Sequence, residues 1–446
     1  MPKNNTLNTA FMVISILLVF FTTSSPATAA DAWKYRMPIT LTHRDAGTAG
    51  LAPVDVTFSL FSDRCTRPEK EIRLVLETAS GEKEIPFQLS RLFRWTKDTE
   101  SGRSLPTQNG MITFFDEAPG NGDARYFLLY GNPDAAAPSY PTDLKVSGKG
   151  PAWTIENSKM VVQLHGKKPG IGESTNHDSG QLSAVTLKSK PDAPFKTAEN
   201  VMHWNPCVFV PARGWIHSFA WDPPEVCEIE TGPLYTEIRR SGAFPGIPEV
   251  HLAVTYRIFT RRAYVESGTV VDVREPIGVV AIRNDQLIFS PGFFTHIGWD
   301  DGGRTVTHPL SSYKPVNKHG DILRLADTVP FLTFYNPAKG VGAATIRESF
   351  SAIGPNGAPP TLFDNATYVS NGDLQYWFRP LIYFHVGWDR KQLITVPQGA
   401  LYSERNLYLF YEPKGNEPVA EVVNLSKAVR SMPGLKIGEY VLPPER

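Results

Sequence analysis

Residues 228–289 constrain the fold of this chain more than any other stretch. They read EIETGPLYTEIRRSGAFPGIPEVHLAVTYRIFTRRAYVESGTVVDVREPIGVVAIRNDQLIF, with four or five runs rich in Val, Ile, Tyr, Phe and Thr between Gly, Pro and charged turns. In LAVTYRIFT, Leu252, Val254 and Tyr256 fall on one face and Thr255 and Arg257 on the other. No helical period competes. We therefore predict the centre of a large antiparallel sheet with basic and aromatic side chains on one face.

The first 30 residues are typical of an export signal. Lys3 is the only charge before an apolar run at 10–21, and Ala27 and Ala29 form an A-x-A cleavage site. The run is too short to span a bilayer comfortably. We expect cleavage near Ala29 or Ala30 and a secreted or periplasmic chain with no membrane contact afterwards. An uncleaved membrane anchor is the alternative.

Composition favours many short strands over a helical bundle. Pro (38), Gly (35) and 11% aromatics indicate frequent turns and large apolar side chains. Lys plus Arg and Asp plus Glu both total 45, which argues against a general nucleic-acid partner. Cys207 and Cys227 flank one Trp-rich segment, so an oxidising compartment favours a bridge between them and leaves Cys65 free. Three unpaired buried thiols are the alternative.

The turn pattern divides the chain into two β-rich parts. Residues 31–146 predict six or so strands in a small N-terminal β-sandwich, with 97–110 as a mobile surface loop rather than a lid. A Pro- and Gly-rich linker at 135–151 leads to 150–430, which predict two large stacked antiparallel sheets. One short helix is expected near 424–432, and 431–446 are expected to form a tail. The fold class is all-β.

Several segments of the large part resemble a known architecture. GPLYTEIRRSG, YRIFTRRAYVE, VAIRNDQLIF and YSERNLYLFYEP are similar to the galactose-mutarotase-like supersandwich of many polysaccharide lyases. The earlier EIRLVLETASGEKEIPFQL resembles the N-terminal sandwich of exo-rhamnogalacturonan-lyase-like proteins. The resemblance covers most of the mature chain as a general pattern rather than a sharp motif. Those lyases often carry an α/α toroid, for which this sequence has no helical stretch.

The resemblance implies an acidic polysaccharide or oligosaccharide as partner. A lyase on a uronic acid neutralises the carboxylate, removes the C5 proton and protonates the leaving oxygen. His203 and His217 flank a PARG turn, so a hairpin would bring these two candidates for base and acid together. Trp204 and Trp215 are candidate sugar platforms. Satisfied core histidines and buried tryptophans are the alternatives.

Further candidates come from the strands that follow. Arg239 and Arg240 are adjacent, so only one of them can face a groove, and Arg239 is the candidate. Tyr256 is a candidate proton donor, although it shares the face of core residues. Arg283 and Asn284 follow the buried run IGVVAI and are candidate substrate contacts, with a structural ion pair as the alternative reading for Arg283.

Histidines in loops leave metal binding open. His296 precedes the turn DDGG, which lacks the ligand spacing of a calcium loop, and we treat His296 as a candidate substrate contact. His177, His308 and His319 lie in polar loops, but their scatter is weak evidence for zinc, so a divalent metal stays open and no cofactor is certain. An H-x-G-W-D echo relates residues 296–300 to 385–389.

The sequence lacks a G-x-S-x-G elbow, an H-E-x-x-H helix and a phosphate loop. The main hypothesis is therefore a secreted polysaccharide lyase acting by β-elimination. The alternatives are a non-catalytic carbohydrate-binding or structural exoprotein, and a glycoside hydrolase with paired carboxyl groups.

Overall fold

A computed structural model describes residues 32–95, 106–316, 320–385, 392–431 and 434–438 of the 446-residue chain. The described chain is built from β-strands, and the α-helices with described bounds are α1 (Pro68–Glu71) and α3 (Ala420–Arg430). This confirms the all-β prediction. Within the described residues, no helix is long and apolar enough to cross a membrane. The export signal lies outside the described residues.

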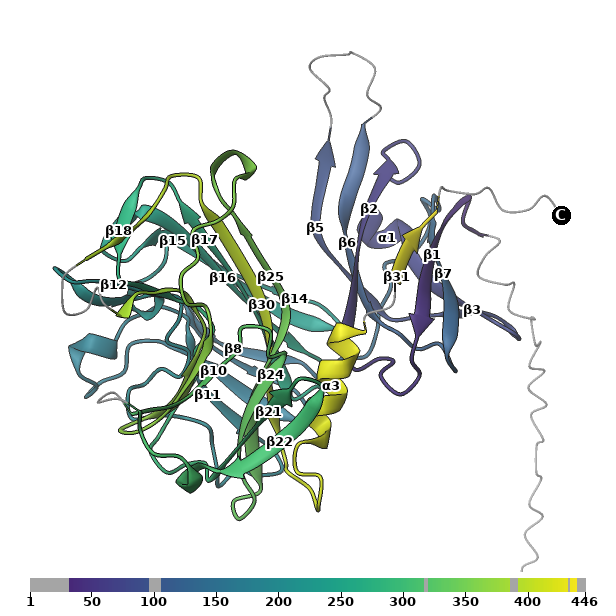
Figure 1. Cartoon of the computed structure of the whole chain (residues 1–446). Helices are drawn as coiled ribbons and strands as arrows, with labels where there is room; N and C mark the ends of the chain where they lie inside the picture. Colours follow the sequence, from purple (N-terminus) through teal and green to yellow (C-terminus); the bar gives the residue numbers. More distant parts are fainter. Residues whose placement is uncertain (1–31, 96–105, 317–319, 386–391, 432–433, 439–446) are drawn as a thin grey trace, which may run out of the picture.

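The N-terminal part is a small sandwich of two antiparallel sheets (Figure 1). Residues such as Ile39, Ile112 and Leu128 point inward from both sheets and are fully buried. The first sheet has the strand order β31 (Gly434–Ile437), β1 (Tyr35–Arg44), β7 (Gly122–Tyr130), β3 (Arg73–Thr78) and β4 (Gly81–Glu84). The second has the order β2 (Pro53–Phe61), β6 (Thr107–Phe115) and β5 (Phe87–Trp95).

The large part begins with a nine-stranded antiparallel sheet. Its first four strands come from residues 226–273, which include most of the stretch that predicted it. The order is β14 (Val226–Thr231), β15 (Tyr235–Phe244), β16 (Ile247–Phe259), β17 (Tyr264–Val273), β30 (Leu401–Tyr411), β25 (Val341–Ile353), β24 (Phe331–Asn336), β21 (His296–Asp301) and β22 (Arg304–Pro309). The end of the predicted stretch, beyond residue 276, leaves this sheet for a second layer.

The second layer consists of smaller sheets stacked on the first. The sheet of interest for function has the order β13 (Gly214–His217), β12 (Cys207–Val210), β19 (Ala281–Arg283) and β28 (Pro380–Tyr383). Beside it lies the order β20 (Ile288–Phe289), β27 (Gln375–Phe378), β26 (Thr367–Asn371) and β23 (Asp321–Leu325). The layer is completed by β11 (Leu182–Leu187), β10 (Met160–Leu164), β9 (Ala152–Glu156) and β8 (Lys145–Lys149), and by β18 (Ile277–Val279) with β29 (Ile394–Val396).

One continuous apolar core fills the space between the two layers. Leu252, Val254 and Tyr256 of β16 contribute to it from the nine-stranded sheet, and Ile282 and Trp377 contribute from the second layer. All five side chains are at most 1% exposed. Because a strand alternates its side chains, the neighbours of Ile282 and Trp377 point to the outer face of the second layer.

Four observations refine the expected boundaries. Helix α3 confirms the helix near 424–432, apart from Met432, which lies outside the described residues. Strand β8 begins at Lys145, inside the predicted linker. Strand β31 pairs with β1, so part of the expected C-terminal tail joins the N-terminal sandwich (Figure 1). Residues 107–110 of the predicted loop belong to β6, while 97–105 lie outside the described residues. The division into separately folding domains stays a prediction.

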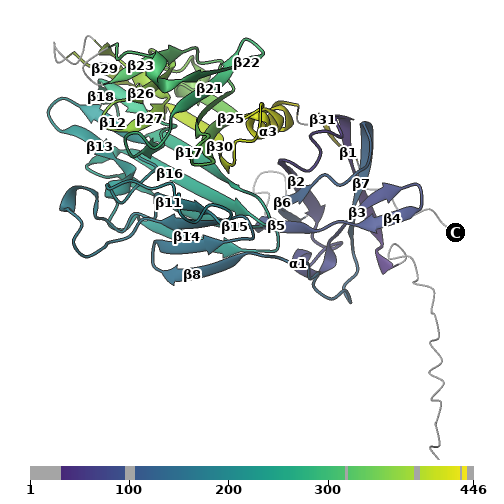
Figure 2. The same cartoon turned by 90° about the horizontal axis from the view of Figure 1, so that it is seen from below.

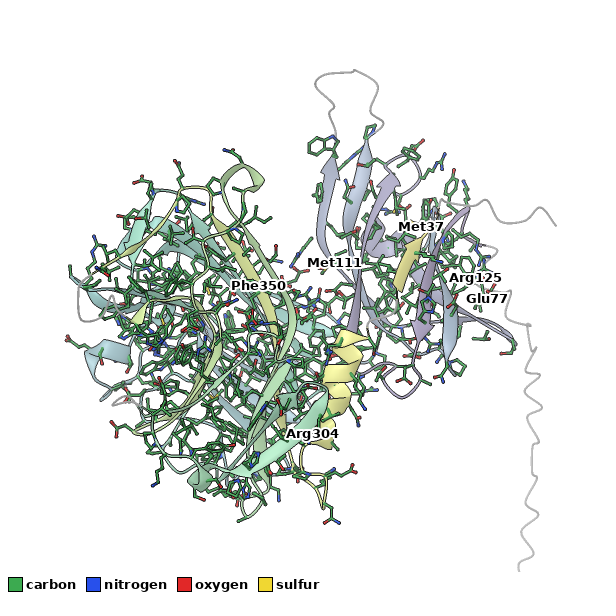
Figure 3. All side chains as sticks on the ribbon, viewed as in Figure 1. Met37, Glu77, Met111, Arg125, Arg304 and Phe350 are labelled. Carbon is green, nitrogen blue, oxygen red and sulfur yellow. The ribbon has the colours of Figure 1, made fainter. Side chains whose placement is uncertain are left out.

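Buried charges join the sandwich to the outer face of the nine-stranded sheet. Arg257 of β16 donates to both carboxylate oxygens of Asp55 on β2, at 3.0 and 2.8 Å. It also binds Glu266 at 2.9 and 2.5 Å, and Arg405 approaches the same two carboxylates. Met111, labelled in Figure 3, lines the cavity beside them. The outer face of β16 is therefore covered by protein around Arg257.

The predicted Cys207–Cys227 bridge does not form. All three cysteines are free thiols. Cys207 lies on β12 in the second layer, where its thiol donates to Asn205 Oδ1 at 3.0 Å. Cys227 lies on β14 at the edge of the nine-stranded sheet. Proximity in sequence was misleading, because the intervening chain crosses from one layer to the other.

Candidate functional site

An aromatic face covers the outside of the second layer. Ala281 and Tyr383 project from neighbouring positions on β19 and β28, and Phe378 joins them from β27. Phe209 and Trp215 of the β12–β13 hairpin pack at its border. These strands lie at the end of the large part that is away from the N-terminal sandwich (Figure 2). This face arises because side chains alternate along each strand, so the residues between the outward-pointing ones point inward and fill the core.

A pocket of about 720 Å³ elsewhere is larger, but the aromatic face holds the pocket with the side chains suited to a sugar. We call it the aromatic pocket, and its volume is about 420 Å³. Such a size and an aromatic wall with a few polar groups are typical of small-ligand sites. It is lined by Trp204, Trp215, Arg283, Gln286, Gly320, Ser370, Gly372, Asp373, Leu374, Tyr376 and Tyr383.

Arg283 lies at the centre of the pocket's aromatic wall. Its guanidinium carbon is 4.2 Å from the ring centre of Trp215, 3.7 Å from that of Phe378 and 5.3 Å from that of Tyr383. One Nη donates to the Tyr383 hydroxyl at 3.3 Å. Within the described part of the chain, no carboxylate forms an ion pair with Arg283. The stacked rings hold the cation in place while its charge remains uncompensated.

Three polar atoms at the pocket have no hydrogen-bond partner among the described residues. They are Trp204 Nε1, Arg283 Nε and Gln286 Oε1, and each is buried. The Gln286 side chain is only 2% exposed. Buried polar groups are normally paired, since an unmet donor or acceptor costs free energy. Two donors and one acceptor around one cavity are therefore suited to a polar ligand with hydroxyl or carboxylate oxygens.

The structure brings three predicted contacts together and adds others. Trp204, Trp215 and Arg283, three of the predicted substrate contacts, all line the pocket, and their contact with a substrate stays a prediction. Sequence reasoning missed Gln286, Tyr376, Tyr383 and Asp373. The alternation in QYWF, with Trp377 inward and Tyr376 and Phe378 outward, was a usable signal for this face. No signal in the sequence brings Asp373 of the β26–β27 turn to Trp204.

His203 and Tyr256 lie behind the pocket, inside the core. His203 is 1% exposed and Tyr256 is 0% exposed. The Tyr256 hydroxyl accepts from the Leu182 amide at 3.2 Å and is hydrogen-bonded to His203 Nδ1 at 2.6 Å. His203 Nε2 is 3.2 Å from the Tyr408 hydroxyl. Burial lowers the pKa of His203 to about 3, with a smaller effect from the Arg240 charge. The arrangement matches the satisfied core histidine rather than a group that reaches substrate.

His217 lies beneath Trp204 rather than beside His203. Its Nδ1–H donates to the Trp204 carbonyl at 3.1 Å, and its ring stacks on Phe219 with centres 4.6 Å apart. The predicted hairpin is present, because β12 and β13 pair with Cys207 opposite His217. His203 lies before that hairpin and points into the core. Burial lowers the pKa of His217 to about 4, so it is neutral at physiological pH.

The remaining candidates lie away from the aromatic pocket. Arg239 pairs with Glu228, Glu230 and Glu237 on the nine-stranded sheet at 3.3, 3.2 and 2.9 Å. Asn284 is buried and donates to Glu404 at 2.5 Å. His296 stacks on Tyr335 of β24, with centres 5.0 Å apart. None of these three side chains lines the pocket, because each belongs to another face or layer.

The described residues contain no cluster of three or more His, Cys, Asp or Glu suited to a metal ion. His308 contacts the rings of Trp299 and Tyr313, and His177 lies 3.8 Å from Asp222. His319 lies outside the described residues, as does most of the second H-x-G-W-D segment. The question of a divalent metal stays open.

A polar cluster adjoins the pocket on the far side of Tyr383. The Tyr368 hydroxyl donates to Asp364 at 2.5 Å, and His385 Nε2 lies 3.0 Å from that hydroxyl. Arg324 binds the other oxygen of Asp364 at 2.7 Å. Burial, followed by the hydrogen bond to Asp364, raises the pKa of Tyr368 and keeps it protonated. The cluster fixes the rings that form the aromatic face, since Tyr368 stacks on Phe378.

Comparisons with known proteins show the fold. No family model matches the chain, and no curated protein matches. A solved glycosyl hydrolase family 38 protein from Enterococcus faecalis is similar over 91% of this chain, with 12% identity and a TM-score of 0.50. An α-mannosidase from Enterococcus faecalis V583 gives 91% coverage, 12% identity and a TM-score of 0.52. This chain spans 47% and 46% of those two proteins.

A galactose mutarotase-like protein from Lactobacillus casei is also similar. The similarity extends over 58% of this chain and 99% of that protein, with 10% identity and a TM-score of 0.33. An overlap of that quality carries no argument about function. At these identities the similarity concerns the all-β architecture, and the activity has to be argued from the pocket.

Proposed function

We propose that this chain is an exported carbohydrate-active protein that holds an acidic sugar of a polysaccharide or oligosaccharide in the aromatic pocket. The observation that carries the proposal is Arg283, a cation stacked among aromatic rings with no acidic partner among the described residues. A carboxylate on the ligand would complete its ion pair.

The neighbouring groups fit the rest of a sugar. The faces of pyranose rings are apolar and pack on aromatic side chains such as Trp204 and Trp215, while hydroxyl groups pair with buried polar atoms. Trp204 Nε1 and Gln286 Oε1 supply one unpaired donor and one unpaired acceptor. The similarity of the fold to carbohydrate-processing enzymes agrees with this chemistry but does not by itself assign it.

The test is calorimetric titration of the purified chain with oligosaccharides that contain uronic acids and with their neutral counterparts. We expect binding of the acidic sugars, and about two- to tenfold weaker binding by Trp215→Ala, because one stacked ring contributes about 0.5–1.5 kcal/mol. Equal affinity for neutral and acidic sugars would show that Arg283 does not select acidic sugars. Unchanged binding by Trp215→Ala would remove the pocket from the proposal.

β-Elimination is the second candidate function, and one contact favours it. Arg283 lies 3.3 Å from the Tyr383 hydroxyl, so a carboxylate held by the arginine would lie beside a proton donor. Burial raises the pKa of Tyr383, although the Arg283 charge lowers it in part, so this tyrosine suits the protonation of a leaving oxygen. A hydrolase would need two carboxyl groups, and Asp373 is the single carboxylate among the described residues that line the pocket.

Product analysis separates these functions. Incubation with acidic polysaccharides should produce the ultraviolet absorbance of an unsaturated uronate if the chain is a lyase, and Tyr383→Phe should remove the activity while sugar binding remains. New reducing ends without that absorbance would indicate hydrolysis. Binding with neither product would leave a carbohydrate-binding protein.

A further inference from the structure

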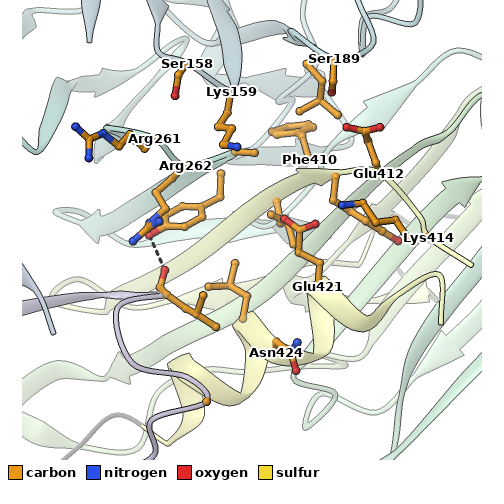
Figure 4. A pocket seen from close by; sticks show the side chains of 18 residues that line it. Ser158, Lys159, Ser189, Arg261, Arg262, Phe410, Glu412, Lys414, Glu421 and Asn424 are labelled. Atoms are coloured by element: carbon orange, nitrogen blue, oxygen red, sulfur yellow. Dashed lines mark hydrogen bonds between the residues drawn. The ribbon is translucent and has the colours of Figure 1, made fainter. Parts of the chain in front are cut away.

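A large cavity lies where four parts of the chain meet. Its volume is about 720 Å³, and we call it the junction cavity. The loop at Gly47 and Leu51 of the N-terminal sandwich forms one wall, and the β16–β17 turn at Arg261 and Arg262 forms another. Helix α3 forms a third, and the segments next to β10 and β11, which include Lys159, form a fourth (Figure 4). It shares no lining residue with the aromatic pocket.

The junction cavity carries an excess of positive charge. Two carboxylates line it, Glu412 and Glu421. The lining also includes four cations, which are Lys159, Arg261, Arg262 and Lys414. None of the four forms an ion pair with a carboxylate of the described residues. Arg262 donates to the Gly50 carbonyl at 2.5 Å, and its Nε is buried without a partner.

Three other arginines of the large part are, in contrast, paired with carboxylates. Arg257 and Arg405 each bind two carboxylates or more, and Arg347 binds Glu404. At the junction, the two carboxylates do not neutralise the cations. Glu412 is 3.9 Å from Lys190, which lies outside the cavity wall. Burial raises the pKa of Glu421, with Lys414 and Lys159 opposing this, so its negative charge is disfavoured.

The uncharged part of the lining suits a sugar. Ser158, Ser189 and Asn424 offer hydroxyl and amide groups, and Leu187 and Leu425 offer apolar surface. In Figure 4, the side chains of Lys159 and Glu421 extend from opposite walls into the same space. A ligand that carries both hydroxyl groups and a negative charge would pair the free cations and leave the apolar wall covered.

We infer that the junction cavity is a second binding site for the acidic glycan, separate from the aromatic pocket. The sugar part of this inference rests on the proposed function, whereas the anionic part rests on the four cations. An acidic chain bound there would contact the N-terminal sandwich, the nine-stranded sheet and α3 at once. Binding would therefore hold the sandwich against the large part and give a polymeric ligand a second attachment point.

The test is calorimetry of the full chain with an oligogalacturonate at low salt. We expect two classes of site. The double substitution Lys159→Gln with Lys414→Gln should weaken one class by about tenfold or more, because charge-assisted contacts are lost, and leave the other intact. Trp215→Ala should do the reverse. Lys149→Gln, an exposed lysine of β8 outside both sites, should change neither.

Each other result has a defined meaning. A single class of site that is insensitive to the double lysine variant overturns the junction site and leaves the aromatic pocket standing. A response to the lysine variant with none to Trp215→Ala removes the proposed pocket function but keeps the junction site. Binding of inorganic phosphate at the junction without binding of oligogalacturonate overturns the glycan assignment. Arg261→Gln provides an independent check, since it should reproduce the lysine effect from another wall.

Discussion

At the scale of single residues, structural and candidate functional groups differ in whether a buried charge or polar atom has a partner within the protein. Arg257 satisfies its charge with Asp55 and Glu266. Arg283 is held by rings and has no carboxylate among the described residues. Both look alike in sequence, as one arginine in or after a strand, but only the second leaves an ionic contact for a ligand.

Arg283 should therefore decide the preference for acidic sugars. Arg283→Gln should weaken binding of uronic oligosaccharides by about tenfold or more, because one charge-assisted contact is lost, and neutral sugars should change little. Titration calorimetry of both ligands measures the difference. Arg304→Gln, at an exposed position on β22 (Figure 3), is the matched control. A similar loss for both sugars would indicate a packing role for Arg283.

His203 makes a prediction about pH rather than catalysis. Its pKa falls from an ordinary 6.5 to about 3 on folding, so its contribution to stability is present above pH 6.5 and is lost as the pH falls toward 3. His203→Gln should reduce the acid loss of unfolding free energy, by about 1.4 kcal/mol for each pKa unit removed. Urea unfolding across this range measures it. An unchanged slope, or an equal change with the exposed His308→Gln, would contradict the prediction.

At the scale of elements, helix α3 binds the two parts through one apolar stripe. Val422, Leu425 and Val429 recur at helical spacing and pack in a cluster that includes Leu51 and Phe115 of the sandwich. The opposite side of the helix carries exposed residues such as Lys427. The helix is short and its capping residue makes no side-chain hydrogen bond, so its stability depends on this packing.

Leu425→Ala tests the role of that stripe. It should lower the free energy of unfolding by about 2–5 kcal/mol, because a buried Leu leaves a cavity when shortened. Lys427→Ala should change it by less than about 0.5 kcal/mol, as surface substitutions do. Equilibrium denaturation of the two variants gives both values. Equal effects would mean that α3 does not pack as described.

At the scale of the whole molecule, a buried ionic network adds to the apolar contacts between the sandwich and the nine-stranded sheet. Burial alone would raise the pKa of Asp55, but the charge and hydrogen bonds of Arg257, with Arg405, lower it to about 2. The ordinary value is 3.8, so this contribution is complete above that pH and is lost as the pH falls through about 2. The two parts are therefore held together over the physiological range.

Removing the charge of Arg257 should weaken the contact between the sandwich and the nine-stranded sheet. Arg257→Leu should destabilise the chain by about 3–5 kcal/mol, because Asp55 and Glu266 become buried carboxylates without their main partner. Arg125→Leu breaks an exposed pair with Glu77 on the outer side of the sandwich (Figure 3) and a contact with the Phe127 ring, and should cost about 1 kcal/mol or less. Thermal and urea unfolding compare the two. Similar losses would show that the interface does not depend on Arg257.

Local periodicity was enough to predict the all-β class, most of the strands of residues 226–273 and, from helical spacing, the position of α3. It also selected Trp204, Trp215 and Arg283, because aromatic and basic residues beside a buried strand are visible as a pattern. It did not separate His203 from Trp204, which are adjacent in sequence. Their opposite directions depend on how the preceding segment crosses from one layer to the other.

The sequence by itself therefore determined the elements and the chemical types available to a site. Only the tertiary structure decided which of those residues meet, that Cys207 and Cys227 lie in different layers, and that Arg257 is paired with carboxylates while Arg283 has no such partner among the described residues. The reason is physical. Side-chain alternation is set by the local backbone, whereas burial and charge pairing are set by strands that are far apart in the chain and come together only when the layers pack.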